Sequence, residues 1–378
     1  MSQQVLKCFC GMDLHSNNTY IGIIDENGRM VFKGRFPNNT DAILDVLVPF
    51  KERLGGVVVE STFNWYFLVD ALQENDYKVH LAHPAANHQY KGLKRTNDKT
   101  SAFWLAELLR LNILKEGYIF PREERHLRDL ARKRTRLVEN RTQYILSFES
   151  LVNRNLGVSI DGNATKKLTE ADIEQMFDNE HLILTAKTNI AMMRCLDERI
   201  KQLEKEILAA AVLKPEFSRL LSVSGIGKVL AIAISLETGP IDRFPEAGNY
   251  ASYSRCVDSK RTSNKKKKGE NNRKNGNRYL AWAFVEAANK MKVHCPQAEG
   301  YYKRKLLRTN NIVATKSLAG KIAKACFYII RDQVDFDVTK MFGQPINPNN
   351  KGSGSKPERG LVIKPTAPIG NTAAAALL

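Results

Sequence analysis

Near the N-terminus, the hydrophobic pattern changes from the spacing of strands to that of helices. Three apolar or β-branched runs predict strands, at 5–12, 19–24 and 30–36. Farther on, helix-like and strand-like runs alternate: a helix over 43–54 that Pro49 breaks or kinks, a strand at 56–60, a helix at 65–74, a strand at 79–82 and a helix at 101–114. Strands in a hairpin that are followed by strands alternating with helices predict a mixed sheet with helices packed on it. We expect this α/β unit to span residues 1–118.

Two long stretches in the middle of the chain carry apolar residues at the spacing of an amphipathic helix. The first lies within 122–155 and the second runs from Met193 to Ile207. A polar segment separates them, which favours an antiparallel, coiled-coil-like arm over residues 119–215. Such an arm would serve dimerisation or spacing. An ordinary helical bundle explains the same pattern about as well.

The last third of the chain is mainly helical, with one polar interruption. Helices are predicted as a close pair within 217–238, then at 279–291 and 314–332. A polar, basic loop at 254–278 separates the pair from the other two. We expect a mostly helical domain at 216–342. From Phe342 the composition turns to Pro, Gly, Asn and Ser and then Ala, which predicts a disordered tail at 343–378.

The net charge of the chain favours one class of binding partner. Its 378 residues include 58 Lys and Arg but only 40 Asp and Glu, a net charge of +18. Such an excess favours a polyanionic partner, most simply nucleic acid. No apolar run is long enough to span a membrane, and the N-terminus lacks the pattern of a signal peptide. Six cysteines do not make a disulfide scaffold. We therefore expect a cytoplasmic protein without a membrane partner.

Three acidic residues in the first domain are candidates for metal binding. Asp13 ends the first predicted strand, Glu60 ends the strand at 56–60, and Asp98 stands just before the helix at 101–114. Phosphodiester cleavage often uses two divalent ions about 4 Å apart, and such hard ions take carboxylate oxygens from separate elements. An acid that ends an apolar strand is well placed for this, because the sheet fixes its backbone. Each acid alone is also consistent with a solvated surface residue or, for Asp98, a helix cap.

The polar loop combines many cations with hydroxyl groups. Its Lys and Arg residues between Tyr253 and Tyr279 are Arg255, Lys260, Arg261, Lys265, Lys266, Lys267, Lys268, Arg273, Lys274 and Arg278. A segment of this kind binds a phosphate backbone with a steep salt dependence, although a solvated loop has the same charge. Ser259, Thr262 and Ser263 lie among these cations. A hydroxyl there could attack a phosphodiester and hold the strand as an ester, whereas serine in a polar loop is usually only a loop residue.

A short glycine motif is a weaker candidate for phosphate binding. Residues 222–228 resemble the turn of a helix-hairpin-helix element, with Gly225, Gly227 and Lys228 before the second helix. Glycines allow backbone N–H groups to approach a phosphate at a helix N-terminus. A plain tight connection between two helices is about as consistent with the motif.

Five segments together carry a family resemblance. They are GMDLH at 11–15, VVVES at 57–61, NDKTSAFWLAELLRLNILKEGYIFPREER at 97–125, SVSGIGKVLAIAI at 222–234 and CVDSKRTSNKKKKGENNRKNGNRYLAWAFVEAA at 256–288. In these segments the chain resembles the bridge-RNA-guided DEDD transposases, insertion-sequence recombinases related to the pilin-gene invertase. The segments sample nearly the whole chain from 5 to about 335 and follow the order of the family.

The resemblance implies an RNase H-like first domain of the RuvC type that binds Mg²⁺ or Mn²⁺. The family's first Asp, its Glu and its next Asp fall on Asp13, Glu60 and Asp98. The family pattern Asp-x-x-Asp-Ala then departs, because Ser101 stands where the fourth carboxylate belongs. The loss of that charge should weaken metal binding. Three explanations stay open: a deliberately inactivated mutant, a natural variant that works with three acids, or an inactive copy in which Ser101 caps the helix.

The resemblance also implies a nucleophilic serine in the C-terminal domain. The motif aligns best on Ser263, with Thr262 and Ser259 as near alternatives. The candidate nucleic-acid contacts are Lys260, Arg261, Lys265, Lys266, Lys267, Lys268, Arg273, Lys274 and Arg278, with Gly225, Gly227 and Lys228 as auxiliary contacts. In the family, the serine and the carboxylates come from different protomers of a tetramer, assembled from dimers. A structured noncoding guide RNA base-pairs with both target and donor DNA.

The leading hypothesis is therefore an enzyme, an RNA-guided DNA transposase of a mobile element in the bacterial cytoplasm and associated with the nucleoid. It would exchange strands through a covalent serine–DNA intermediate, and the guide RNA is implied by the resemblance alone. A metal-dependent, structure-specific nuclease would use the same carboxylates without Ser263. A protein that only binds nucleic acid is a third hypothesis, which Ser101 favours.

Overall fold

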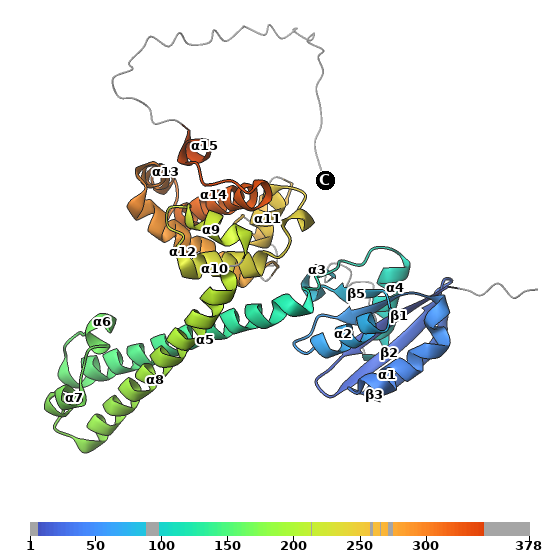
Figure 1. The fold of residues 1–378 in the computed structure, drawn as a ribbon, viewed down its shortest axis with the longest axis horizontal. Helices are drawn as coiled ribbons and strands as arrows, with labels where there is room; N and C mark the ends of the chain where they lie inside the picture. Colours follow the sequence, from blue (N-terminus) through green and yellow to red (C-terminus); the bar gives the residue numbers. More distant parts are fainter. Residues whose placement is uncertain are drawn as a thin grey trace, which may run out of the picture.

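A computed structural model describes residues 7–87, 98–212, 214–257, 260–264, 266–270 and 275–343. An N-terminal α/β unit is followed by two long helices and then by a C-terminal helical unit (Figure 1). Apart from Gly343, the predicted tail at 343–378 lies outside the described residues. Among the described residues, no helix is both long enough and apolar enough to cross a membrane.

The N-terminal unit is built on a five-stranded mixed sheet. Its strands are β1 (Cys8–Leu14), β2 (Asn18–Asp25), β3 (Met30–Pro37), β4 (Leu54–Glu60) and β5 (Val79–Ala82). They lie in the order β3-β2-β1-β4-β5. Strand β2 is antiparallel to its neighbours β1 and β3, whereas β4 is parallel to β1 and β5 is parallel to β4. The Asn27-Gly28 turn joins β2 to β3, and Gly28 takes a φ of 78° there. The predicted mixed sheet is confirmed.

Helices cover both faces of this sheet. They are α1 (Thr40–Leu47), the 3-10 helix η1 (Val48–Arg53), α2 (Tyr66–Glu74), α3 (Pro84–Asn87) and α4 (Asp98–Arg110). The apolar side chains of α1 and α2 form one core with Met12, Ile21 and Val57. Helix α4 packs on the opposite face, next to Gly11 of β1. The break expected at Pro49 is confirmed, since α1 ends at Leu47 and η1 follows.

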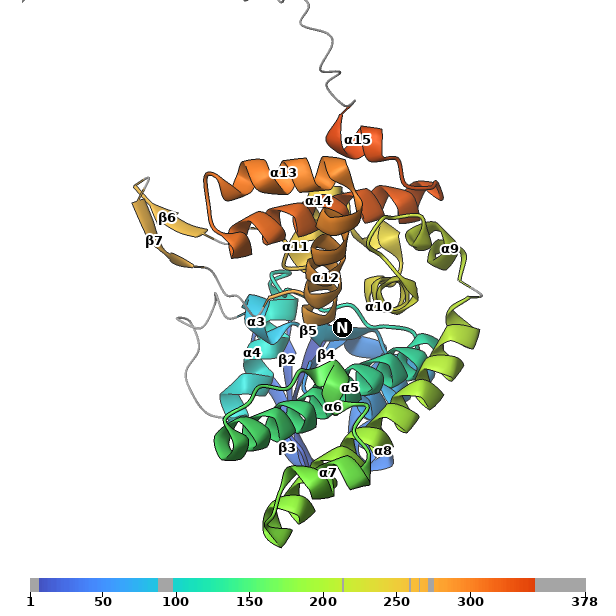
Figure 2. The same ribbon diagram turned by 90° about the vertical axis from the view of Figure 1, so that its left-hand side faces the viewer.

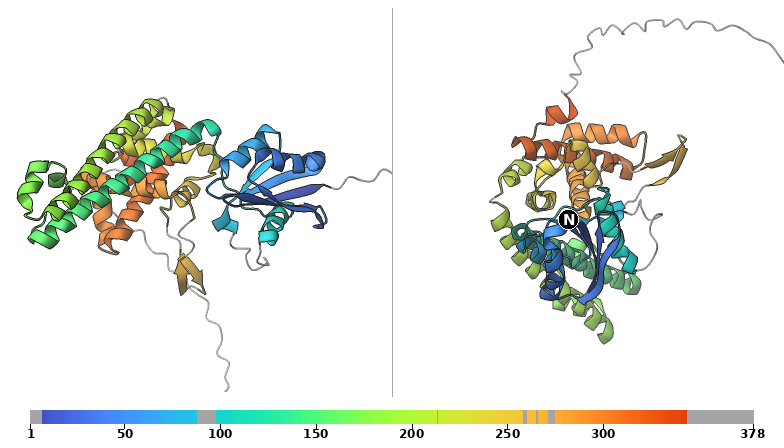
Figure 3. Two further views of the ribbon diagram at one scale, coloured as in Figure 1. Left: turned by 90° about the horizontal axis from the view of Figure 1, so that it is seen from below. Right: turned by 90° about the vertical axis from the view of Figure 1, so that its right-hand side faces the viewer.

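Two long antiparallel helices form the middle of the chain, as predicted. They are α5 (Arg122–Leu156) and α8 (Glu180–Ala211), and the short helices α6 (Gly162–Thr165) and α7 (Glu170–Met176) connect them. Ion pairs join Arg134 to Glu204 and Arg141 to Asp197, seven residues apart on each helix, so the register is constant over this stretch. The two arginines interrupt the apolar stripe because their charges have acidic partners on α8. The N-terminal sheet lies at the start of α5 (Figure 3).

The C-terminal unit is a helical bundle with one small sheet. Its helices are α9 (Pro215–Leu221), α10 (Lys228–Thr238), η3 (Ile241–Arg243), α11 (Ala247–Tyr253), α12 (Arg278–His294), α13 (Pro296–Leu306), α14 (Asn311–Asp332) and α15 (Val338–Phe342). Tyr250, Phe284 and Phe327 are the largest side chains at its centre.

The segment expected to be a polar loop contains a β-hairpin instead. Strands β6 (Lys260–Ser263) and β7 (Lys266–Glu270) are antiparallel, with Lys260 opposite Glu270. The pair stands out from the helices (Figure 2). Lysine and glycine disfavour strands, so local propensity did not reveal it.

Candidate active site

Asp13 and Glu60 lie side by side at one edge of the sheet. Met12 is opposite Val59 in the parallel β1–β4 pair, so the next residue of each strand is one of these two acids. Successive side chains of a strand alternate between faces. Gly11 contacts α4, and Val58 packs with Leu105 of α4. Both acids therefore lie on the face of the sheet that α4 covers.

The N-terminus of α4 lies at the same edge as these acids. Gly56 of β4 is close to Leu109, whereas Val58 packs with Leu105, so α4 runs antiparallel to β4. The first turn of the helix, with Asp98 and Ser101, therefore comes to the end of β4. Asp98 is also four residues before Ala102, the residue that contacts Gly11, so the two share one side of the helix. The backbone thus brings all four positions of the predicted acidic site together.

The side chains of this site are described only in part. Asp13 is buried, with 5% of its surface exposed, and Nε2 of His15 lies 3.7 Å from its Oδ2. The side chain of Asp98 lies outside the described residues. Among the described side chains, no three His, Cys, Asp or Glu residues are grouped so that they could hold a metal ion. Metal binding by Asp13, Glu60 and Asp98 stays a prediction.

The short loop after Glu60 carries an exposed aromatic ring. Nδ2 of Asn64 donates to the carbonyl oxygen of His15 at 3.0 Å, and the backbone N–H of Ser61 donates to the carbonyl oxygen of Ala82 at 3.2 Å. The loop holds Phe63 with 84% of its surface exposed. An exposed ring in a basic protein can stack on a nucleobase. The sequence analysis did not identify Phe63. A large apolar residue in a polar loop is the sequence signal that could have indicated it.

Ser263 lies at the tip of the β6–β7 hairpin. It is the last residue of β6 and is opposite Lys266, and Asn264 beside it turns the chain with a φ of 49°. Thr262 is one position farther from the tip, and Ser259 lies outside the described residues. The side chains of Lys266 and Lys268 are exposed. The other predicted cations of this segment have no described side chain, namely Lys260, Arg261, Lys265, Lys267, Arg273 and Lys274.

The two ends of the hairpin segment are fastened to each other. Nε and Nη2 of Arg255 donate to the carbonyl oxygen of Gly276 at 3.0 and 2.7 Å. The backbone N–H of Asn277 donates to the carbonyl oxygen of Tyr253 at 2.6 Å. Gly276 has a φ of 86°, and a Cβ there would overlap the carbonyl oxygen of Tyr253. We call Tyr253, Arg255, Gly276 and Asn277 the neck of the hairpin.

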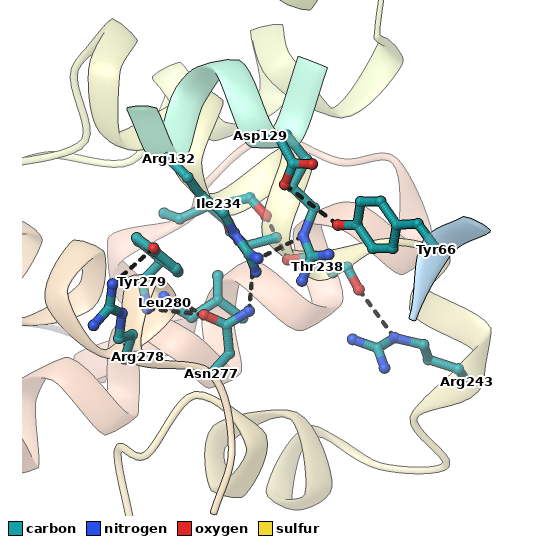
Figure 4. A network of polar contacts seen from close by, with 12 residues as sticks. Tyr66, Asp129, Arg132, Ile234, Thr238, Arg243, Asn277, Arg278, Tyr279 and Leu280 are labelled. Carbon is teal, nitrogen blue, oxygen red and sulfur yellow. Dashed lines mark hydrogen bonds and ion pairs between the residues drawn. The ribbon is translucent and has the colours of Figure 1, made fainter. Parts of the chain in front are cut away.

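A buried carboxylate connects this neck to α5. Glu237 of α10 is 3% exposed and accepts hydrogen bonds from Arg128 at 3.0 Å, Arg132 at 2.6 and 2.8 Å and Nδ2 of Asn277 at 2.6 Å. Figure 4 shows Arg132 of α5 and Asn277 at the start of α12 close to each other in this network. Burial alone would raise the pKa of Glu237, but the hydrogen bond from Arg132 and the charges of both arginines outweigh it and lower that pKa. Sequence analysis missed this cluster because its members are far apart in the chain.

The α9–α10 turn gives its two glycines different environments. A Cβ on Gly225 would lie 2.6 Å from the carbonyl oxygen of Ala287 on α12, so packing alone explains this glycine. Gly227 and Lys228 are exposed at the start of α10. Arg278, another predicted contact, is exposed at the start of α12 and donates to the hydroxyl of Tyr279 at 2.9 Å. Nucleic-acid binding by these residues stays a prediction.

Two models of transposase families match the chain, in the regions that contain these two sites. Residues 10–154, which include Asp13, Glu60 and Asp98, match the DEDD transposases of IS110 type, described as Transposase. Residues 217–303, which include the β6–β7 hairpin, match a family described as Transposase IS116/IS110/IS902 family. No curated protein sequence matches the chain.

The two matches, together with a mixed sheet and a mostly helical remainder, define a transposase of a mobile element. The chain belongs to the IS110 family of transposases, which confirms the resemblance found in its sequence motifs.

Proposed function

We propose that this transposase is an RNA-guided DNA recombinase that works through a covalent serine–DNA intermediate. The observation that carries the proposal is the convergence of Asp13, Glu60 and the first turn of α4 at one edge of the sheet. A strand order of β3-β2-β1-β4-β5, with β4 and β5 parallel to β1, supports an RNase H-like fold of the RuvC type. The serine at the tip of a basic hairpin supports a second catalytic group.

The donor set at the sheet edge fits Mg²⁺ or Mn²⁺. Asp13 and Glu60 offer carboxylate oxygens from two fixed strands, and Asp98 adds a third acid from α4. The bound ion would polarise the scissile phosphate and stabilise the leaving oxygen. Ser101 contributes a neutral hydroxyl at the fourth position, so the site holds one negative charge fewer than a four-acid site. We expect correspondingly weaker binding of the metal.

The serine step conserves atoms and charge. The Oγ of Ser263 attacks phosphorus, a P–Oγ bond forms, and the P–O bond to one neighbouring nucleotide breaks. The serine proton ends on the leaving oxygen, which gives a free hydroxyl end. Attack by the hydroxyl of another strand on the ester releases Ser263 and joins the new strands. Cations of the hairpin, including Lys266 and Lys268, stabilise the charge that develops on the phosphate.

The partners that follow from the family resemblance are a structured noncoding RNA, target DNA and donor DNA. Base pairing with the RNA would supply sequence specificity, so the protein itself would read mainly backbone and shape. The chain would form dimers that assemble into a tetramer, with the serine and the carboxylates of one site on different protomers. Mass photometry of the complex with RNA and both DNAs would test this state, and a monomer would contradict it.

Sequencing the RNA that copurifies with the protein from cells carrying its flanking DNA tests guidance. One abundant structured RNA, with separate loops complementary to two DNA sites, supports the proposal. Heterogeneous RNA, or none, bound to a well-folded protein would contradict RNA guidance. The chain would then be an enzyme that reads DNA directly.

With such substrates in hand, Ser263→Ala tests the covalent step, and Thr262→Ala is its matched control in the same strand. We expect the first variant to lose the protein–DNA adduct and strand exchange, and the second to keep both. If Ser263→Ala still cleaves DNA, the metal-dependent nuclease becomes the better description. If neither the original chain nor Ser101→Asp exchanges strands, the chain is a nucleic-acid-binding protein only.

A further inference from the structure

One short stretch of α5 contacts both the carboxylate unit and the serine unit. Arg125 donates to Asp70 of α2 and to the carbonyl oxygen of Phe120, both at 2.6 Å. Asp129 accepts from the hydroxyl of Tyr66 at 3.3 Å. Arg128 and Arg132 bind Glu237. These four helix residues lie within about two turns, so α5 is held from both sides over a short length.

On its N-terminal side, this stretch contacts two aromatic residues that are close in sequence to Glu60, a candidate metal ligand. Tyr66 follows Glu60 by six residues, and Trp65 beside it is buried. The guanidinium of Arg125 lies 4.7 Å from the ring centre of Trp65 and 4.8 Å from that of Tyr66. The strand that ends at Glu60 is therefore followed within six residues by Trp65 and Tyr66, which contact α5.

On its C-terminal side, the same stretch is linked through Glu237 to the neck of the serine hairpin. Asn277 belongs to the neck and is also the N-cap of α12, with its Oδ1 accepting from the N–H groups of Tyr279 and Leu280 at 2.8 and 3.1 Å. Its Nδ2 is the group that reaches Glu237. One asparagine side chain thus fixes the base of the hairpin to a buried carboxylate that two arginines of α5 already hold.

We propose that Glu237 and Asn277 are positioning residues, which fix the serine-bearing hairpin to α5 and so set where Ser263 is presented. In the part of the chain that the structure describes, β6 and β7 pair with each other, and the neck joins the two ends of the hairpin segment to the helical bundle. Nucleophilic attack is sensitive to displacements of about 1 Å, which cost on the order of 100-fold in rate. This inference rests on the proposed role of Ser263, but the position of the hairpin can be measured without catalysis.

The informative variant is Asn277→Ser. Serine keeps the N-cap of α12 but is too short to reach Glu237, so the fold is retained and only the link is lost. The matched control is Asn310→Ser. Asn310 is the N-cap of α14 and accepts from the N–H of Val313 at 2.9 Å, without any contact to the neck.

Spin labels measure the position of the hairpin directly. Cys195 on α8 is exposed, whereas the other five cysteines are buried, so one label site is natural. The second is Asn264→Cys at the hairpin tip, where the side chain is exposed. The chain with Cys195 alone gives the background. In the full-length protein we expect one dominant label-to-label distance, a broader or shifted distribution in Asn277→Ser, and no change in Asn310→Ser.

Covalent adduct formation with DNA gives the second readout. We expect Asn277→Ser to lower its rate by about 10- to 100-fold, with nucleic-acid affinity equal to that of Asn310→Ser. An unchanged label distribution in Asn277→Ser would overturn the positioning role, whatever the adduct rate. A changed distribution together with adducts that do not require Ser263 would keep the positioning of the hairpin and reject the serine mechanism.

Discussion

Gly11 on β1 and Ala102 on α4 touch through their backbones. A Cβ on Gly11 would overlap the carbonyl oxygen of Ala102 and lie 2.8 Å from the amide nitrogen of Ala106. Asp13 is two residues beyond this contact on β1, and Asp98 is one helical turn before it on α4. The contact between two backbones therefore sets how closely the acids of the strand and of the helix approach each other.

Gly11→Ala is expected to push α4 away from the sheet. Overpacking of this kind costs about 1–3 kcal/mol in the free energy of unfolding, and it should also reduce stabilisation by Mn²⁺. Thermal unfolding with and without Mn²⁺ measures both effects. Gly248→Ala is the control, because nothing lies within 4 Å of a Cβ on this residue of α11. Equal melting temperatures for the two variants would contradict the importance of the contact.

Much of the N-terminal site could be predicted from sequence because its signals are local. Asp13 is the penultimate residue of β1 and Glu60 is the last residue of β4, and the end of an apolar strand is visible in a few residues. The alternation of strands and helices gave the layer arrangement, and the family motif gave Asp98. What the sequence could not show was the contact of Gly11 with α4, since nothing near Gly11 in the chain indicates it.

The Glu237 cluster could not be predicted for a related reason. Arg128 and Asn277 are 109 and 40 residues from Glu237, and an acid on an apolar helix such as α10 has no distinctive local pattern. The β6–β7 hairpin was hidden by its lysines, which suggest a solvated loop. The cluster depends on contacts between distant residues, which periodicity does not detect, whereas the hairpin pairs locally but has a composition that disfavours strands.

Ser101→Asp is expected to restore a fourth carboxylate and tighten metal binding. Without metal, the added charge repels nearby carboxylates, so the melting temperature should fall. With saturating Mn²⁺, stabilisation should exceed that of the original chain. Titration of Mn²⁺ monitored by thermal unfolding measures both signs. Ser101→Asn matches the size without the charge and should show neither change; equal behaviour of Asp and Asn would reject a metal at this edge.

Lys266 and Lys268 are expected to contribute to nucleic-acid binding through their charge. Replacing both by Gln should weaken binding and lower the slope of log affinity against log salt by about 1 to 2 units. Fluorescence anisotropy at several salt concentrations measures that slope. The control replaces Lys166 and Lys167, two exposed lysines near the far end of α5 and α8, and removes the same charge. A similar loss of slope in both double variants would assign the effect to net charge rather than to the hairpin.

The buried carboxylate of Glu237 should make the stability of the chain depend on pH. Its pKa in the folded protein is lowered, whereas an unfolded glutamate titrates at about 4.3. The ion pairs of Glu237 therefore stabilise the fold fully above that unfolded value, and this stabilisation is lost as the pH falls through the folded pKa. Glu237→Gln leaves Arg128 and Arg132 buried without a carboxylate and should cost about 3–5 kcal/mol at pH 7. Because the original chain loses its own ion pairs in acid, the difference in melting temperature between the two proteins should shrink below about pH 4.3. A difference that stays constant from pH 7 to pH 3 would show that the carboxylate charge does not hold the two arginines.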